Sequence, residues 1–397
     1  MARLLLLSNG HGEDLSGALL GQALQRCGHQ VDALPLVGSG HPYRDAGIPV
    51  VLNTREFSTG GLGYTSLQGR LTELIQGQVF HLLAGLLRLT RLRRRYSLIV
   101  AIGDVIPVMA AWISGRPVAT YLVAYSSHYE GRLNLPWPCA PCLRSHRFRA
   151  VFSRDRLSAD DLSLQLGRTV QFAGNPFMAP VLTPAPPLPP IDSRLALLPG
   201  SRRPELEQNL RLLLTVIERL PAQGFNDGTL GVDLALIRAL GDAELEALAL
   251  TDGWCLEKNG TSACLVRGQH RVDVRRGQFA SVLQAADVVI SMAGTAAEQA
   301  VGLGKPVLQV AGQGPQFTAS FAEAQRRLLG PGVFCAEGAS GASETLSRSA
   351  RMALDLLMRS RQDQSLQQLC RQQAENRLGA DGGADRMAAT IDALLTP

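Results

Sequence analysis

Residues 291–299, Ser-Met-Ala-Gly-Thr-Ala-Ala-Glu-Gln, constrain the fold of this chain more than any other stretch. The apolar, β-branched run 287–290 before them is typical of a buried parallel strand, and Pro306 opens a second run of this kind. The stretch therefore joins a strand to a helix within a βαβ unit. Because the first amides of such a helix have no intrahelical partner and the helix dipole is positive there, we expect an anion at this turn.

The residues of this turn fit one particular kind of anion. Gly294 permits close approach of a phosphate to the backbone, and Thr295 either caps the helix or donates its hydroxyl. Glu298 follows one helical turn later, where a carboxylate suits two vicinal hydroxyls such as those of a ribose. The set predicts a bound nucleoside diphosphate. The alternative is a structural helix whose small residues pack against a sheet.

Composition limits the class of protein. A chain of 397 residues exceeds one ordinary core, so two domains are expected, and 46% apolar with 18% charged residues is typical of a well-packed globular protein. The 7 cysteines are scattered and odd in number, which predicts no disulfide framework. Neither they nor the 7 histidines have metal-ligand spacing, so no metal is expected. Cys139-Ala-Pro-Cys142 lies among prolines that predict an irregular loop.

No secretory signal or membrane-spanning segment is predicted. Only four leucines follow Arg3, and the most apolar long run, 98–115, is interrupted by Asp104 and Pro107. We expect a cytoplasmic protein, either free or peripheral on the cytoplasmic face of the inner membrane. The net charge of +5 resides mainly in clustered arginines without interleaved aromatic residues, so no nucleic acid is expected as a partner.

The first half of the chain begins as a Rossmann-like βα unit. A strand at 4–7 leads into the loop 8–14, and a helix and a second strand follow. The dinucleotide fingerprint fails, because Leu15 occupies the third glycine position. The loop instead suits a neutral, hydroxyl-bearing acceptor or general-base chemistry through its polar residues Asn9, His11, Glu13 and Asp14. Capping of the first helix by the two carboxylates is the alternative.

Two later strand ends in this half also carry polar residues. Asp104 follows the predicted strand 97–102, and Ser127 and His128 follow the predicted strand 118–123. Ligands gather at the carboxyl ends of strands in open α/β sheets, so Asp104 is a candidate base and the other two are candidate acceptor contacts. Asp104 is also placed to cap a helix that starts at Val105. Strands at 151–152 and 170–172 complete this half.

A helix is predicted from about Arg70 to Tyr96, with apolar residues at helical spacing and a basic end that holds Arg88, Arg91, Arg93, Arg94 and Arg95. One interpretation is a core helix with a solvated arginine end, since cations stabilise a helix C-terminus. The other is docking of its exposed apolar and arginine residues on an anionic membrane surface. The loop 133–143 around Trp137 is a second candidate for lipid contact.

A second domain follows the proline-rich residues 180–190 and starts with a strand at 195–198. The next turn, Pro199-Gly-Ser-Arg-Arg-Pro-Glu205, suits an anion, because Arg202 can grip a phosphate in a bidentate manner and Ser201 adds a hydroxyl. A surface arginine on a turn is the alternative. Further strands are expected at 232–237, 263–266 and 272–274, and helices at 344–377 and 384–395.

Three motifs occur in a characteristic order: Gly174-Asn-Pro176, Leu197-Leu-Pro-Gly-Ser-Arg202 with Glu205, and Gly294-Thr-Ala-Ala-Glu298. With the two Rossmann-like halves, they resemble lipid-A-disaccharide synthase, a GT-B glycosyltransferase family, over most of the chain. The resemblance implies an α/β fold of GT-B architecture, with two Rossmann-like doubly wound domains facing a central cleft. Residues 1–176 would bind the acceptor, 177–193 would form the linker and 194–383 would bind the nucleotide sugar, while the C-terminal helix 384–397 would pack back on the first domain.

The resemblance also implies an activity. It is a metal-independent, inverting transfer of a glucosamine-type sugar, either acylated or not, from a UDP donor to a lipid-linked or other amphiphilic acceptor, with no cofactor. The implied donor-binding residues are Ser201, Arg202, Gly294, Thr295, Ala296, Glu298, Gln313 and Gln316. Asp104, or else His11 or Glu13, would act as the base, and the implied acceptor-side residues are Asn9, Asp14, Ser127 and His128.

The chain departs from the family on the acceptor side. The family's first loop reads Gly-Glu-x-Ser-Gly-Asp, whereas this chain has Gly10-His-Gly-Glu-Asp14, and residues 124–130 replace a Trp-bearing segment. Asp104 lies in Ile-Gly-Asp rather than in the family's longer acidic motif. These differences resemble the divergent lipid-A-disaccharide synthase-related group. Two other functions stay open: a UDP-sugar 2-epimerase of the same architecture, and a non-catalytic protein that binds a nucleotide sugar or a lipid.

Overall fold

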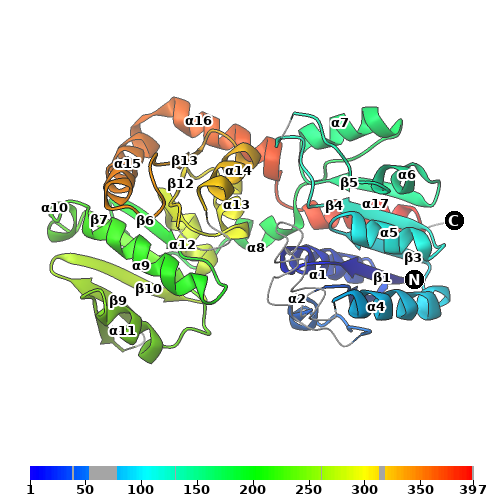
Figure 1. Ribbon diagram of the computed structural model, residues 1–397, viewed down its shortest axis with the longest axis horizontal. Coiled ribbons are helices and arrows are strands. Elements are labelled where there is room, and N and C mark those ends of the chain that lie inside the picture. Colours follow the sequence, from blue (N-terminus) through cyan, green and yellow to red (C-terminus); the bar gives the residue numbers. More distant parts are fainter. Residues whose placement is uncertain (38–39, 53–77, 130, 261, 313–317, 396–397) are drawn as a thin grey trace. The chain divides into compact units, whose positions relative to one another are not determined.

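The computed structural model (Figure 1) describes residues 1–37, 40–52, 78–129, 131–260, 262–312 and 318–395, without the side chains of 11 and 78–83. The chain divides into two compact units. The first comprises Met1–Ala179 together with Gly379–Pro397, and the second comprises Pro180–Leu378. Each unit has its own sheet and its own buried core.

The first unit is built on a five-stranded parallel sheet in the order β2-β1-β3-β4-β5. Its strands are β1 (Arg3–Ser8), β2 (Gln30–Pro35), β3 (Leu98–Ile102), β4 (Val118–Leu122) and β5 (Phe148–Ser153). Leu4, Leu5, Leu6 and Leu7 are all 0% exposed, as expected for a parallel strand that helices cover on both faces. The helices are α1 (His11–Arg26), α2 (His41–Asp45), α4 (Gln78–Leu92), η2 (Arg93–Arg95), α5 (Val105–Ile113), α6 (Cys139–Arg144), α7 (Arg156–Leu166), η3 (Pro176–Met178) and α17 (Gly383–Ala393).

The C-terminal helix α17 packs against α1 of the first unit. Arg26 Nη2 lies 2.6 Å from Asp385 Oδ1, and His29 Nε2 lies 3.0 Å from Asp392 Oδ1. The returning backbone passes so close to Gly174 that a Cβ on Gly379 would lie 2.6 Å from the Gly174 Cα. Glycine at position 379, where φ is +83°, therefore meets both a conformational and a steric requirement.

The second unit contains an eight-stranded sheet in the order β13-β12-β11-β6-β7-β10-β9-β8. Its strands are β6 (Ser193–Leu198), β7 (Leu230–Leu236), β8 (Cys255–Asn259), β9 (Ser262–Arg267), β10 (His270–Arg276), β11 (Val288–Ser291), β12 (Val307–Gln309) and β13 (Val333–Cys335). Among the described strands of this sheet, the pairings β8–β9 and β9–β10 are antiparallel and the others are parallel. The helices are α8 (Ala179–Leu182), α9 (Glu205–Glu218), α10 (Gln223–Asn226), α11 (Asp242–Leu250), α12 (Phe279–Ala285), α13 (Thr295–Gly302), α14 (Ala319–Leu329), α15 (Ser343–Gln362), α16 (Gln364–Gln373) and the π-helical turn η4 (Ala374–Leu378).

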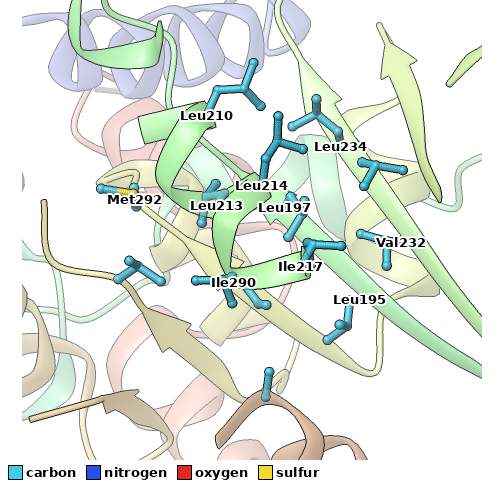
Figure 2. Packing of buried hydrophobic residues seen from close by; sticks show 14 of the residues in the cluster. Leu195, Leu197, Leu210, Leu213, Leu214, Ile217, Val232, Leu234, Ile290 and Met292 are labelled. Carbon is cyan, nitrogen blue, oxygen red and sulfur yellow. The ribbon is translucent and has the colours of Figure 1, made fainter. Parts of the chain in front are cut away.

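The core of the second unit lies between α9 and the strands β6, β7 and β11 (Figure 2). Leu210, Leu213 and Ile217 recur on one face of α9 at helical spacing and are at most 1% exposed. They pack with apolar residues of the three strands, among them Leu197 and Ile290. This packing fixes the position of α9 and of β11 relative to β6, and with them the turns at the ends of these strands.

Two predicted helices need comment. The helix expected over 70–96 is present over Gln78–Leu92 and continues as a 3₁₀ turn over Arg93–Arg95, and its expected first part, 70–77, lies outside the described residues. The helix expected over 344–377 is interrupted at Asp363, whose side chain accepts a hydrogen bond of 3.1 Å from the Leu366 amide and so caps a new helix, α16. An aspartate inside an otherwise helical pattern marks this break, because its side chain competes for backbone amides.

The prediction of an irregular loop at Cys139–Cys142 is wrong, because these residues open the short helix α6. Burial raises the pKa of the Cys139 thiol to about 12, so this pair does not have the reactive thiolate that redox chemistry requires. The strand expected at 170–172 is reduced to a single bridge between Gln171 and Phe152. Within the described part of the chain, no helix is long and apolar enough to cross a membrane.

Candidate functional site

The topology of the second sheet brings two turns together. From β6 the chain moves outward to β7 and β10, and it then returns to β11 on the other side of β6 and continues to β12 and β13. Ser291 at the end of β11 therefore pairs with Leu198 at the end of β6. The turns that follow these two residues lie side by side at the point where the winding direction reverses, which is where open α/β sheets bind ligands.

The turn after β6 is held against the turn after β11 by direct contacts. Gly200 has a φ of +96°, and a Cβ on it would lie 3.3 Å from the Met292 carbonyl oxygen. Asn209 of α9, which is 6% exposed, donates its side-chain amide to the carbonyls of Pro199 at 2.9 Å and Met292 at 3.3 Å. One buried amide thus links both turns. Asn209 is not among the residues predicted from the sequence, although a polar residue within the apolar stripe of α9 is a visible signal.

Two adjacent arginines of the first turn have different environments. Arg203 pairs with Glu207 and, at 3.0 Å, with Glu244. The Arg202 side chain is exposed and has no ion pair or hydrogen bond to any described residue, while its carbonyl accepts from the Leu206 amide at 2.8 Å. Ser201 beside it is also exposed. Of the two guanidinium groups, that of Arg202 is therefore the one without a protein partner in the described part of the chain, and its predicted role toward a phosphate stays a prediction.

The turn after β11 opens α13. Gly294 is the N-cap residue and Thr295 is the first helical residue, so Thr295 does not cap this helix and no side chain does. The Ala297 and Glu298 amides bond to the Gly294 carbonyl at 3.0 and 3.2 Å. The amides of Thr295 and Ala296 have no backbone acceptor among the described residues. Donors of this kind at a helix N-terminus are suited to an anion, and the predicted binding of one here stays a prediction.

Two of the predicted donor residues cannot be placed. Gln313 and Gln316 lie outside the described residues. Glu298 lies in the first turn of α13 and is partly exposed. No cluster of three metal-ligating side chains occurs in the described part of the chain.

The first sheet has an equivalent reversal between β1 and β3. Ser8 pairs with Ile102 at the ends of these strands, so the segments after them are neighbours. Gly103 has a φ of +135°, and a Cβ there would lie 2.2 Å from Asn9 Oδ1 and 3.3 Å from Glu13 Cγ. The absence of a side chain at Gly103 therefore allows Asn9 and Glu13 to lie against the backbone next to Asp104. The structure brings three of the predicted first-domain residues together.

Asp104 caps α5 and is also partly exposed. Its Oδ1 accepts from the Ile106 amide at 2.8 Å, so the predicted capping role is present. Burial raises the pKa of this carboxyl, and hydrogen bonds from the Ile106 amide and the Asn9 side chain oppose the shift. Asn9 Oδ1 is buried without a hydrogen-bond partner among the described residues, so a hydroxyl donor would find an acceptor there. A carboxylate with a raised pKa beside an unpaired acceptor suits proton removal from a hydroxyl.

Helix α1 begins at His11, so the predicted loop 8–14 is short and Asp14 lies in the first helical turn. Asp14 is 1% exposed and accepts a hydrogen bond of 2.6 Å from Ser8 Oγ, which in turn accepts one of 2.9 Å from the Tyr43 hydroxyl. Burial raises the pKa of Asp14 to about 7. This predicted acceptor-side carboxylate is directed into the core. The side chain of His11 is outside the described part.

The other two predicted acceptor-side residues pack on α7. Ser127 is 0% exposed, and its Oγ donates to Asp161 Oδ2 at 2.8 Å. His128 Nε2 lies 3.7 Å from Oδ1 of Asp155, the N-cap residue of α7. Both residues follow β4 as predicted, but the bonds of Ser127 are internal. Asn9, Glu13 and Asp104 are therefore the predicted residues that this edge of the sheet groups together.

Comparisons with known proteins support this architecture. No protein-family model matches the sequence, and no curated protein matches it. Among solved structures, the calicheamicin glycosyltransferase CalG4 matches with a TM-score of 0.63 and 18% identity, over 99% of this chain and 98% of that chain. A putative UDP-N-acetylglucosamine 2-epimerase from Listeria monocytogenes matches with a TM-score of 0.56 and 16% identity, over 99% and 96%.

A third solved structure extends the comparison to a bound ligand. UDP-GlcNAc 2-epimerase from Neisseria meningitidis, in a structure described as bound to UDP-GlcNAc, matches with a TM-score of 0.52 and 14% identity, over 98% of this chain and 99% of that chain. At these identities the likeness establishes the fold. The chain has the GT-B fold with two Rossmann-like domains, as the sequence predicts.

Proposed function

We propose that this protein transfers a glucosamine-type sugar, with inversion, from a UDP donor to a lipid-linked or other amphiphilic acceptor. The observation that carries the proposal is the pairing of two turns at the switch point of the second sheet, one bearing Arg202 and the other opening α13, both suited to an anion. Structures of the same fold include glycosyltransferases and an epimerase described as bound to UDP-GlcNAc, which supports a UDP sugar as the ligand.

The donor turns supply the electrostatics that the transfer requires. As the bond between the sugar and the diphosphate breaks, negative charge develops on UDP. The amides of Thr295 and Ala296 and the guanidinium of Arg202 stabilise that charge, and they are positioned before the reaction begins. Glu298 accepts hydrogen bonds from the ribose hydroxyls. Because these groups provide the positive potential, the proposed transfer needs no metal.

The acceptor side is assigned to the first unit. Asp104 removes the proton from the acceptor hydroxyl, and Asn9 Oδ1 orients that hydroxyl by accepting a hydrogen bond in an earlier step. Glu13, which lies against Gly103, is the second candidate for the base. Arg91 of α4 and Arg94 and Arg95 of η2 are exposed, and they are the residues through which we expect contact with anionic lipid.

Isothermal titration with UDP, UDP-GlcNAc and ADP tests the donor site. The uridine ligands are expected to bind in the micromolar range, and Arg202→Ala should abolish that binding. Arg203→Ala is the matched control, because Arg203 is engaged by Glu207 and Glu244 and should tolerate the change. We expect turnover to fall at least about a hundredfold for Arg202→Ala and Glu298→Ala. Equal affinities of the Arg202 and Arg203 variants for UDP would contradict the assignment.

The second candidate function is a UDP-sugar 2-epimerase, which the structural similarity to two proteins of that name favours. The two reactions differ in their need for an acceptor. An epimerase converts UDP-GlcNAc alone into its C2 epimer and retains the sugar on UDP. A transferase releases UDP only when an acceptor is added, so NMR of UDP-GlcNAc incubated with the protein, with and without lipid extract, separates the two functions.

A further inference from the structure

A buried glutamine lies directly beneath the turn that opens α13. Gln325 of α14 is 5% exposed, and its Nε2 is 3.7 Å from the position that a Cβ on Gly294 would occupy. It belongs to the buried stripe of α14 with Ala322 and Leu328. A polar side chain in such a stripe is costly unless its donor and acceptor are used, so its surroundings reveal what the amide does.

A second glutamine, Gln309, fixes the orientation of the Gln325 amide. Gln309 ends β12, pairs with Ser291 of β11 and is 0% exposed. Its Nε2 donates to Gln325 Oε1. A glutamine amide has its acceptor and its donor on opposite sides, so the engaged oxygen of Gln325 faces Gln309 and its NH₂ group faces the turn at Gly294.

The donor of Gln325 has no acceptor among the described residues, since its one hydrogen bond there uses Oε1. The neighbouring cation does not compete for a ligand, because Arg326 is paired with Glu323 at 2.7 and 2.9 Å. The first amides of α13 are likewise without backbone acceptors in the described part of the chain. A side-chain NH₂ group and a helix N-terminus thus present hydrogen-bond donors at the same turn.

We propose that Gln325 donates a hydrogen bond from its side-chain amide to the diphosphate of the nucleotide bound at Gly294, and that Gln309 is the positioning residue that holds this amide in its orientation. The inference rests on the proposed function, since it assigns a further ligand residue to the same donor site. It gives Gln309 and Gln325 a role at this position, where apolar side chains would pack without leaving any polar group unpaired.

The test compares two ligands that differ only in the diphosphate. Gln325→Glu keeps the oxygen that accepts from Gln309 and replaces the free donor by an oxygen that repels phosphate. UDP affinity is expected to fall at least about tenfold, because a hydrogen bond to a charged group is lost. The affinity for uridine, measured by displacement of UDP, should change less than about twofold, because uridine has no phosphate to contact. The same change at an exposed glutamine of this unit, Gln372→Glu, is the control and should affect neither ligand.

The role of Gln309 is tested through non-additivity. Gln309→Met removes the donor at similar volume, which frees the Gln325 amide to rotate and should weaken UDP but not uridine. The double variant Gln309→Met/Gln325→Leu should bind UDP no more weakly than Gln325→Leu alone, because the first residue acts through the second. Equal losses for UDP and uridine would show that Gln309 serves the fold only and would overturn its assignment.

The outcomes also separate this inference from the proposed function. If the wild-type protein binds UDP and Gln325→Glu binds it equally well, the amide does not contact the diphosphate and the inference is wrong while the proposed function stands. If the wild-type protein binds no uridine nucleotide, both are wrong. Melting temperatures of all variants, measured without ligand, exclude unfolding as the cause of a lost affinity; Gln325→Asn, which withdraws the donor by one methylene, replaces any variant that does not fold.

Discussion

Asn209 provides the sharpest test of how the donor site is assembled. Its side-chain amide donates to Pro199 at 2.9 Å and to Met292 at 3.3 Å, one carbonyl from each of the two turns. Asn209→Leu keeps a side chain of similar size and removes both hydrogen bonds. The shorter bond leaves a carbonyl that costs about 1 to 3 kcal/mol when unsatisfied, and the longer bond adds less. We therefore expect the free energy of unfolding of the second unit to fall by about 2 kcal/mol.

The three tryptophans of the chain allow this unit to be observed separately. Trp254 is the one tryptophan of the second unit; it is 0% exposed and donates to Glu218 Oε1 at 2.6 Å. It belongs to the core cluster that includes Leu210 and Leu213, the neighbours of Asn209 on α9. In a Trp112→Phe/Trp137→Phe background, its emission maximum during urea denaturation therefore reports the unfolding of the core that holds both turns.

Gln208 provides a matched control. It precedes Asn209 on α9 and is exposed, so Gln208→Leu changes a neighbouring amide that bonds neither turn. It should leave the free energy of unfolding within about 0.5 kcal/mol of the parent. If Asn209→Leu also stays within that range and binds UDP normally, the bridge between the turns does not stabilise the site, and this account of its assembly is wrong.

Three further predictions concern the first unit and the cysteines. Gly379→Ala should lower the free energy of unfolding by more than about 2 kcal/mol, because the added Cβ meets the Gly174 Cα. Gly28 has a similar φ and open space around it, so Gly28→Ala is the control and should cost about 1 kcal/mol. Thermal melting measures both. Burial raises the pKa of Asp14 to about 7, so the folded state retains a proton that the unfolded state loses near pH 4. The free energy of unfolding should therefore fall as the pH rises from 4 to 7. Urea titrations at several pH values should show this slope in the parent protein and its loss in Asp14→Asn. Iodoacetamide at pH 8 should label the exposed Cys255 in the native protein, but Cys139 only after denaturation, as mass spectrometry can show.

The sequence predicts the fold where local pattern and burial agree. Parallel strands such as β1 and β11 are continuous apolar runs, and the glycine turns after them identify the strand-to-helix junctions. The pattern is less informative at the edge of the second sheet. Strand β8 is mostly exposed, and β13 has three residues, so neither has the burial pattern that distinguishes a strand from a loop.

A break within a helix leaves little trace in the sequence pattern. The periodicity across 344–377 is continuous, and the interruption depends on one side chain, Asp363, that caps a new helix instead of facing solvent. The same residue type in α1 behaves differently, because Asp14 turns inward to Ser8 and becomes buried. Which of these roles an aspartate takes depends on tertiary contacts that a linear pattern does not contain.

The residues of the candidate site likewise divide into those with a local sequence signal and those whose role depends on tertiary contacts. Arg202, Gly294 and Thr295 are candidates from the sequence alone because glycine turns and unpaired helix amides are local properties. Asn209 and Gln325 could not be assigned, because each acts on a turn that is remote in sequence: Asn209 reaches Met292, and Gln325 lies under Gly294. Their signal in the sequence is only a polar residue within an apolar helical stripe.

The two sheets place similar turns at similar points, yet the side chains give these turns opposite electrostatic character. At the switch point of the second sheet, the available groups are donors: Arg202 and the first amides of α13. At that of the first sheet, the grouped residues Asn9, Glu13 and Asp104 carry acceptor oxygens, among them the unpaired Asn9 Oδ1, and a diphosphate there would meet carboxylates. Because the topology is shared and the charges are not, the fold alone does not assign the ligands. The side chains at each switch point carry our proposal instead: those of the second unit suit an anion and those of the first suit a hydroxyl, as the proposed transfer of a sugar from a UDP donor to an alcohol acceptor requires.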